Sequence, residues 1–424
     1  MIDRLLLRYI INQAVHWFIP GMFTPVMVLL LLDQGLGLIE VGTVLALYSG
    51  TVIILELPTG GMADAIGRKR VYTASLGVSM LALIFLLFGR DFISLAIGFV
   101  IYGVARALSS GSIDAWFVDE FNREHPEGNL QKALGTANVF IPIGLALGAL
   151  VGGLIPTLFG EAASGLTGMG RYSANILAMM LMVVVQILLT SVLIKENMIK
   201  VGRKSVAQGF KDVPHVLHDA VEFGIRDRNT RLLLTATLAF GFALFSLELL
   251  WQPRLKGIIG SDSQSWIFGV VAAGYFAMAS VGSALSGKLA DLFKGNLYLT
   301  LVVVAVGISA SITILALQES VIGFVALYFI VYMLIGLMGS PHAAAFNAGI
   351  PSEKRSTLMS FDSLVSQLGG VVASVTLGVV SGLFSIEVAW FISSIVLVVS
   401  FLAYFVLWRG SLGEGMPKPK TGEH

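Results

Sequence analysis

Four ionisable side chains lie inside long apolar segments of this sequence, where charged residues are rare: Glu56, Arg106, Asp114 and Glu248. An ionisable group within a membrane is costly, and it usually faces a water-filled cavity or belongs to a proton pathway. A carboxylate there can bind and release a proton, and an arginine can pair with a carboxylate or with an anionic ligand. These four residues are therefore candidates for proton coupling or for the wall of a substrate cavity.

The candidates in the first half of the chain leave several roles open. Glu56 precedes Pro58, which frees a backbone carbonyl, so Glu56 could carry a proton, pair with Arg106 or cap a helix. Asp114 follows Arg106 by eight residues, about 12 Å along one helix at the usual rise. We expect these two side chains to share a similar face without pairing directly.

Glu248 and two histidines extend the candidate set. Glu248 precedes Trp251, so it could lie at the membrane interface beside an aromatic anchor, or it could face a cavity. His16 and His342 could titrate near neutral pH, or they could be hydrogen-bonded within a helix bundle. The spans also carry aromatic side chains that suit an adaptable apolar pocket or ordinary packing: Trp17, Phe18, Tyr102, Trp116, Phe245, Trp251 and Tyr332.

The composition indicates a membrane protein. Charged residues make up 12% of the 424 residues, whereas soluble proteins have about 25%. The net charge of +1 gives no reason to expect nucleic acid as a partner. The absence of cysteine excludes disulfides and thiolate metal sites, and we expect neither a cofactor nor a metal. The apolar segment after Met1 lacks a small-residue cleavage site, so we expect it to be retained as the first helix.

Twelve segments are long enough to cross a membrane as helices, for which about 20 apolar residues suffice. They lack the alternation of barrel strands. The predicted fold is therefore all-α, with twelve transmembrane helices in two pseudo-symmetric six-helix bundles. The expected spans are roughly 9–32, 38–63, 71–89, 92–118, 133–160, 172–194, 232–253, 263–287, 296–318, 320–352, 363–386 and 388–408.

Basic residues predict the orientation. With a cytoplasmic N-terminus, 22 of the 27 Lys and Arg residues fall on the cytoplasmic side, four on the other side and one within a span. Both termini are then expected in the cytoplasm, in a multi-pass protein of the cell inner (plasma) membrane. The expected organisation is a bundle at 1–194, a cytoplasmic linker at 195–231, a bundle at 232–408 and a cytoplasmic tail at 409–424. Part of the linker, 213–224, could be an interfacial helix or a solvated linker.

One short motif occurs twice, at the end of the second span of each half. Glycine, two residues, alanine and aspartate recur around Asp64 and Asp291, and basic residues follow both. Asp64 would end a helix at the cytoplasmic face, where it could meet the positive N-terminal end of the helix that begins near Ser356. That contact would hold the two halves together in the outward-facing state. Alternatively, the loop only sets the topology.

This loop resembles the signature of the major facilitator superfamily, Gly-x-Leu-Ala-Asp-Arg-x-Gly-Arg-Lys. The chain departs from it at Met62 and Ala65, and it supplies Gly60, Ala63, Asp64, Gly67, Arg68 and Lys69. The resemblance extends over essentially the whole chain. It implies a transporter with spans one, four, seven and ten around a cavity, and it places Arg106 where the family's fourth helix carries an arginine.

A glycine pattern in the fifth span resembles the antiporter pattern of the same superfamily, Gly-x8-Gly-x3-Gly-Pro-x2-Gly-Gly. Ala149 stands in place of its proline, and Pro142 could bend the helix instead. The matching residues are Gly135, Gly144, Gly148, Gly152 and Gly153. The resemblance implies drug/proton exchange. Glycines every four residues also permit close helix packing in lipid.

No catalytic or nucleotide-binding motif is present, so the chain is not expected to be an enzyme or to use ATP. The hypothesis is a monomeric secondary active transporter that exports a small amphipathic compound or drug in exchange for protons, by alternating access in the lipid bilayer. Neutralising Asp114 or Glu56 should uncouple it. A proton-coupled uptake symporter is the alternative, and a non-transporting membrane sensor is a remote one.

Overall fold

The computed structural model describes residues 3–196, 226–260, 264–348 and 355–413, and every regular element in these ranges is a helix. Twelve helical segments there are long and apolar enough to cross a membrane, which confirms the predicted fold class. The helices are α1 (Arg4–Phe23), α2 (Met27–Asp33), α3 (Leu38–Ile66), α4 (Arg68–Phe88), α5 (Phe92–Ser109), α6 (Ser112–Glu124), α7 (Leu130–Asn138), α8 (Phe140–Thr167), α9 (Ser173–Leu193), α11 (Arg228–Ile259), α12 (Ser265–Leu292), α13 (Leu297–Ala316), α14 (Val321–Ala348), α15 (Arg355–Leu383) and α16 (Ile386–Gly413).

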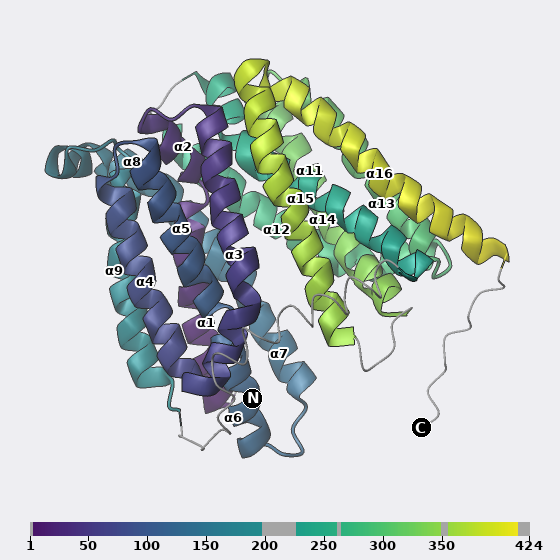
Figure 1. Ribbon diagram of the computed structural model, residues 1–424, viewed down its shortest axis with the longest axis horizontal. Coiled ribbons are helices and arrows are strands. Elements are labelled where there is room, and N and C mark those ends of the chain that lie inside the picture. The colour runs from purple at the N-terminus through teal and green to yellow at the C-terminus, as the bar shows by residue number, and fades with distance from the viewer. Residues whose placement is uncertain (1–2, 197–225, 261–263, 349–354, 414–424) are drawn as a thin grey trace.

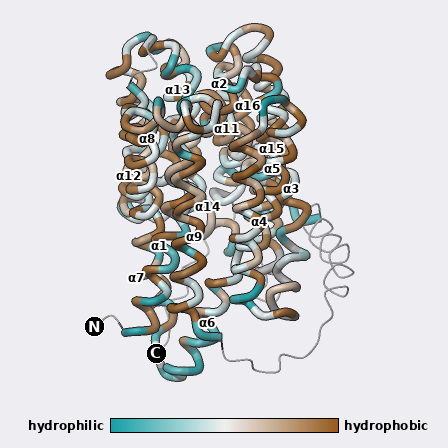
Figure 2. Tube along the Cα trace, turned by 90° about the vertical axis from the view of Figure 1, so that its left-hand side faces the viewer, coloured by the Kyte–Doolittle hydropathy of each residue, from teal (hydrophilic) through white to brown (hydrophobic). Residues whose placement is uncertain are grey.

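The helices form two bundles that lie side by side, α1–α9 and α11–α16 (Figure 1). We call them the N-half and the C-half. The end of the molecule at which α1 begins and α6 lies is called the α6 face. The opposite end, with α2 and the start of α3, is the α2 face. Apolar residues extend along the length of the bundle, and hydrophilic residues gather toward its two ends (Figure 2).

Three of the spans are interrupted, each for a local reason. Pro25 separates α1 from α2, because it has no N–H with which to continue the helix. Gly111 has a φ of 68° and separates α5 from α6, a left-handed conformation that glycine adopts readily. Pro142 cannot bond the carbonyl of Asn138, where α7 ends. Val139 between the two helices keeps helical dihedral angles, with φ of −66° and ψ of −31°, so the expected bend near Pro142 stays a prediction.

Most helix boundaries lie within a few residues of the expected ones, but several helices are longer: α15 begins at Arg355 rather than at 363, and α8 ends at Thr167 rather than at 160. The second bundle begins at Arg228 rather than at 232, and α16 continues to Gly413 rather than ending at 408. Most of the expected linker, 197–225, lies outside the described residues, and so does the proposed interfacial segment 213–224. The same holds for residues 414–424 of the expected tail.

The two halves touch through glycines toward the α2 face. Gly153 of α8 lies so close to Gly269 of α12 that a Cβ on Gly153 would be 2.5 Å from the Gly269 Cα. On the other side of the molecule, a Cβ on Gly42 of α3 would be 3.0 Å from the Gly378 Cα of α15. Real Cβ atoms do not come this close to backbone. Backbone therefore meets backbone between the halves.

Gln252 closes the same end with hydrogen bonds across the halves. This residue of α11 is buried, and its Oε1 accepts a bond of 2.8 Å from the Val28 N–H of α2. Its Nε2 donates to the Thr24 carbonyl at the end of α1. Gln252 thereby satisfies backbone groups that the interruption at Pro25 leaves without helical partners. The α2 face is the closed end of the interface between the halves.

Most of the glycine stripe of the fifth span packs inside the N-half. Gly144, Gly148 and Gly152 of α8 all face the backbone of α1, and a Cβ on Gly144 would be 2.6 Å from the Ala14 carbonyl oxygen. Gly153 faces the C-half instead. Gly135 lies on α7, before the interruption, and nothing is within 4 Å of its Cβ position. The five glycines therefore do not form one continuous surface, contrary to the single-helix prediction.

Candidate functional site

A cavity of about 450 Å³ lies between the two halves, within the usual size of a small-molecule site. Residues from both halves line it. Among the candidates predicted from the sequence, His16, Arg106 and Glu248 are in its wall, together with the aromatic residues Trp17 and Tyr102. The cavity is therefore the candidate substrate site. Its wall does not include Glu56, Asp114 or His342.

Arg106 supplies the positive charge of the cavity. It lies in the last turn of α5, where the negative end of the helix favours a cation. The carbon of its guanidinium group is 4.9 Å from the ring centroid of Trp17 on α1, which is a cation–π contact. The stack covers one face of the guanidinium. Its N–H groups lie in the plane of the group and remain suited to a ligand.

Glu248 supplies the negative charge, from the opposite half. It lies on α11, one turn from Gln252, and its side chain is exposed to the cavity rather than packed among apolar groups. Of the two readings of the sequence, the cavity position is the one observed. Tyr48 lies in the electrostatic field of both Arg106 and Glu248. The two charges thus act on the same cavity without forming an ion pair.

His16 reaches the cavity with one ring nitrogen held in place. The Gln186 Nε2 donates to the Asn12 carbonyl at 3.1 Å and to the Tyr72 hydroxyl at 2.7 Å. The Tyr72 hydroxyl, already an acceptor, is left to donate to the His16 Nδ1 at 2.9 Å. This chain of bonds favours the neutral imidazole with its proton on Nε2. His16 is therefore hydrogen-bonded within the bundle, one of its two sequence interpretations, and it also lines the cavity.

Glu56 connects the two halves outside the cavity. One of its carboxylate oxygens accepts from the Ser110 hydroxyl of the N-half at 3.2 Å. The other accepts from the Gln367 amide of α15, in the C-half, also at 3.2 Å. The sequence left open a pairing of Glu56 with Arg106, and the described contacts of Glu56 are these two amide and hydroxyl donors instead. Glu56 is half-buried, and its carboxylate is hydrogen-bonded to both halves.

Asp114 does not lie on the same helix as Arg106, contrary to the sequence analysis. The turn at Gly111 starts a new helix, and Asp114 is exposed in the first turn of α6. Its carboxylate accepts a bond of 2.6 Å from the Tyr9 hydroxyl and another from the Gln13 amide, both on α1. Carboxylates are favoured in the first turn of a helix. The observed role of Asp114 is to fasten α6 to α1.

His342 forms a polar cluster within the C-half, away from the cavity wall. Its Nε2 is 3.4 Å from an Asp362 carboxylate oxygen and 3.1 Å from the Thr237 hydroxyl. Thr237 in turn donates to Asp362 at 2.6 Å. The Tyr404 hydroxyl lies 3.0 Å from the His342 Nδ1. The sequence analysis missed Asp362, because a span defined by the absence of charge begins just after it, at 363.

The basic residues of the loop after α3 bind within the N-half. Arg68 forms an ion pair of 2.7 Å with Asp119 of α6, and its backbone N–H donates to the Glu196 carboxylate at 2.7 Å. The Lys69 ammonium donates to the Ile194 carbonyl at 2.6 Å, just after α9. In this structure, Arg68 and Lys69 thus join α4, α6 and α9. A role in holding the two halves together remains a prediction for another state.

Each of the two related loops contains a glycine with positive φ, although only Gly67 directly caps its helix, because α12 ends at the cap residue Phe293. Gly67 has a φ of 111°, and a Cβ on it would be 3.0 Å from the Glu196 carboxylate. Gly295 has a φ of 76°, four residues after the exposed Asp291. Both glycines adopt positive φ, which other residues rarely do. The side-chain contacts of Asp64, and the surroundings of Gly60, lie outside what the structure describes.

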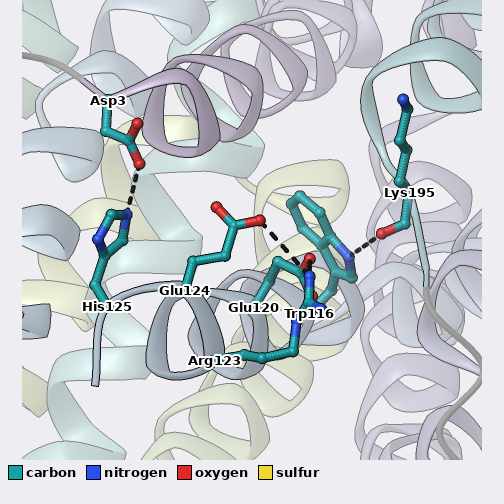
Figure 3. Close-up of polar contacts among 7 residues, drawn as sticks. All are labelled: Asp3, Trp116, Glu120, Arg123, Glu124, His125 and Lys195. Carbon is teal, nitrogen blue, oxygen red and sulfur yellow. Dashed lines mark hydrogen bonds and ion pairs between the residues drawn. The ribbon is translucent and has the colours of Figure 1, made fainter.

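Helix α6 is hydrogen-bonded to residues before α1 and after α9 (Figure 3). The Trp116 indole N–H donates to the Lys195 carbonyl, 3.2 Å away beyond α9. At the other end, the His125 Nε2 lies 2.7 Å from an Asp3 carboxylate oxygen. This hydrogen bond lowers the pKa of Asp3 below its usual value. Trp116 therefore anchors a helix at the α6 face and is not part of the pocket.

The wall contains further residues that the sequence analysis did not single out. Tyr48 stacks on Tyr102 at a centroid distance of 5.8 Å on the N-half side. Tyr275 and Phe276 of α12 face them from the C-half, next to Gln252. Gln252 could have been found from the sequence, because a polar glutamine in an apolar span is a candidate for a cavity wall or a contact between helices. The tyrosines gave no such signal, because aromatic residues occur equally on lipid-facing surfaces.

Two bundles with six membrane-spanning segments each, around a shared cavity, are the architecture of a multi-pass membrane transporter. A family model described as Major Facilitator Superfamily matches residues 9–374, and the chain belongs to this family. It is 21% identical over 401 residues to YxaM of Bacillus subtilis (strain 168), described as an uncharacterized MFS-type transporter; the match covers 93% of this chain and 94% of YxaM.

Solved structures share the fold. A mutant of the nucleoside transporter NupG matches with a TM-score of 0.78 at 12% identity, covering 95% of this chain and 99% of that one. A bacterial homologue of the human lysosomal transporter Spinster, in an inward-facing and unoccupied conformation, matches with a TM-score of 0.72 at 14% identity. That match covers 98% of each chain. At these identities, the likeness extends to the fold alone.

Proposed function

We propose that the protein exports a small amphipathic molecule through the central cavity in exchange for protons. The observation that carries the proposal is the cavity itself, whose wall is divided between the two halves and contains Arg106 on one side and Glu248 on the other. A site formed by both halves is exposed to alternate sides of a membrane when the halves rock. The resemblance of Gly144, Gly148, Gly152 and Gly153 of α8 to part of the antiporter pattern is further support for exchange over symport.

The proposal includes a route by which a proton affects the motion. As a carboxylate, Glu56 accepts bonds from Ser110 and from Gln367 of the other half. A protonated carboxyl group has one oxygen that donates, so one of these bonds is lost. The bond with Gln367 forms only while α3 and α15 are together, which couples proton binding to the position of the halves. We further propose a monomer in the cytoplasmic membrane, with both termini in the cytoplasm.

Everted membrane vesicles test the direction and the coupling. In vesicles acidified inside by respiration, addition of a cationic dye or another amphipathic compound that is a substrate should release protons, seen as recovery of a quenched pH-sensitive fluorophore. Compounds would be screened in vesicles with and without the protein. An uptake symporter would give no recovery when the compound is added outside. If no compound moves in any gradient, the transporter is not a proton exchanger.

Replacing Glu56 with glutamine should separate coupling from binding. The amide keeps the size of the side chain and, like a protonated carboxyl group, has one accepting oxygen and one donating group, but it cannot release a proton. We expect accumulation driven by a pH gradient to fall roughly ten-fold or more, the effect of about 1.4 kcal/mol in the coupling free energy. Exchange of labelled for unlabelled substrate in proteoliposomes should persist. Glu161→Gln, at an exposed position of α8, is the control, and equal accumulation in both variants would exclude Glu56.

A further inference from the structure

We propose that the cavity binds a zwitterion, a molecule that carries one positive and one negative charge on an apolar or aromatic body. The inference rests on the proposed function, in that it takes the cavity to be the substrate site. Its starting observation is that the lining contains one arginine and one glutamate, on opposite walls. The substrate's anionic group would bind Arg106 of the N-half, and its cationic group would bind Glu248 of the C-half.

Neither charge is neutralised by the protein. Among the described residues, Arg106 has the stacked Trp17 ring but no carboxylate within ion-pair distance, and Glu248 has no cation. Asp114 is the nearest acidic residue to Arg106 along the span. It lies on α6, beyond the interruption at Gly111, and it is hydrogen-bonded to Tyr9 of α1. His16, next to Arg106 in the wall, is held by Tyr72 in a form that favours neutrality. The cavity therefore presents two uncompensated charges of opposite sign.

This arrangement discriminates between classes of substrate. An isolated charge away from bulk water is costly, and the cost falls when a ligand supplies a partner. A singly charged or neutral ligand would leave Arg106, Glu248 or both without a partner while displacing the water around them. A zwitterion supplies both partners at once. The planar guanidinium, with Trp17 on one face, suits two parallel bonds to a carboxylate or a phosphate.

The rest of the wall fits the body of such a molecule. Tyr48 and Tyr102 form a stacked pair on one side, and Trp251, Tyr275 and Phe276 contribute aromatic surface on the other. The volume of about 450 Å³ accommodates a ring with a short charged arm. A ligand held this way connects the two halves through its own charges. Its binding is thereby sensitive to the distance between them.

Matched ligands of different charge test the inference. Tryptophan, tryptamine and indole-3-propionate share a ring and are respectively a zwitterion, a cation and an anion at pH 7. The same series without a ring is 6-aminohexanoate, hexylamine and hexanoate. Binding to the purified protein is measured by calorimetry and by the shift in melting temperature. We expect the zwitterion of at least one series to bind roughly ten-fold more tightly than either single ion, the effect of one charge-assisted bond.

Variants assign each end of the ligand. In Arg106→Gln, the zwitterion should lose its advantage over the amine but keep its advantage over the acid. In Glu248→Gln, the opposite pattern is expected. This crossed result does not follow from a structural role of either residue. Arg90→Gln and Glu161→Gln, both at exposed positions, are controls that should bind like the original protein.

Three results would overturn the inference: tighter binding of a single ion, no binding of either zwitterion, or unchanged selectivity in both cavity variants. The binding assay needs no gradient, so it is independent of the vesicle experiment. Zwitterion selectivity without proton release would refute the exchange mechanism and leave the substrate class intact. Proton release by cations or neutral compounds alone, with no zwitterion bound, would refute the zwitterion as the substrate class and leave the exchange mechanism intact.

Discussion

Replacing Gly152 with leucine should prevent the protein from folding to its native state. A Cβ at this position would be 2.7 Å from the backbone carbon of Met22 on α1, and the obstacle is backbone rather than a side chain that can rotate away. Overpacking of a core costs about 1–3 kcal/mol when neighbours can adjust. Here α1 must separate from α8 along its length, so we expect little folded protein on size-exclusion chromatography.

A glycine of the same pattern supplies the control for this variant. Gly135→Leu, on α7, introduces the same side chain where nothing lies within 4 Å. It should give a melting temperature close to that of the original protein. If Gly135→Leu folds but abolishes proton exchange, the pattern has a function beyond packing. Normal folding of Gly152→Leu would show that α1 and α8 do not pack as described.

Replacing Gly153 with leucine should leave the N-half folded but prevent the α2 face from closing. The side chain would enter the contact with Gly269, where a Cβ already comes within 2.6 Å of the backbone nitrogen. Only the approach of the two halves is obstructed. A cost of about 1–3 kcal/mol would shift the closed-to-open equilibrium roughly five-fold or more. We expect substrate binding to persist and turnover to fall.

The chain contains no cysteine, so a single introduced thiol reports on this closure without background. Thr24 lines the cavity near its closed end, and only its backbone carbonyl binds Gln252. In a Thr24→Cys background, Gly153→Leu should accelerate labelling by a membrane-impermeant maleimide from the α2 face. Gly165→Leu, at an open position of α8, should not. Equal labelling rates in the two variants would contradict the assignment of Gly153 to the closing contact.

The number of membrane spans and their helical structure could be predicted because the membrane restricts the structure that an apolar segment can adopt. Backbone groups in lipid must bond internally, so a long apolar run forms a helix. The interruptions were harder to predict. Gly111 is an ordinary glycine among small residues, and only its conformation shows that α5 and α6 are separate helices. For this reason the sequence analysis placed Asp114 on the same helix as Arg106, whereas it lies on α6.

The sequence could predict residues of the cavity wall chiefly where they are charged. Arg106 and Glu248 stand out in apolar surroundings, and both are in the wall. Tyr48 and Tyr275 do not stand out, because a membrane helix is apolar on the faces toward lipid and toward its neighbours alike, and periodicity does not separate them. Asp362 was missed because spans were defined by the absence of charged residues. The expected span therefore began at 363, although Asp362 lies within α15.

The glycine contacts between the halves have a kinetic consequence. At Gly42–Gly378 and Gly153–Gly269, the residues that meet carry no side chains. Side chains that interdigitate must change rotamer before two helices can part, and they must find their places again on return. Contacts between glycine backbones require neither step, and the C–H···O interactions in such contacts are weak. These glycine contacts can therefore separate and re-form without changes of rotamer, so the specific bonds that must break when the closed end opens are those of Gln252 to Val28 and Thr24.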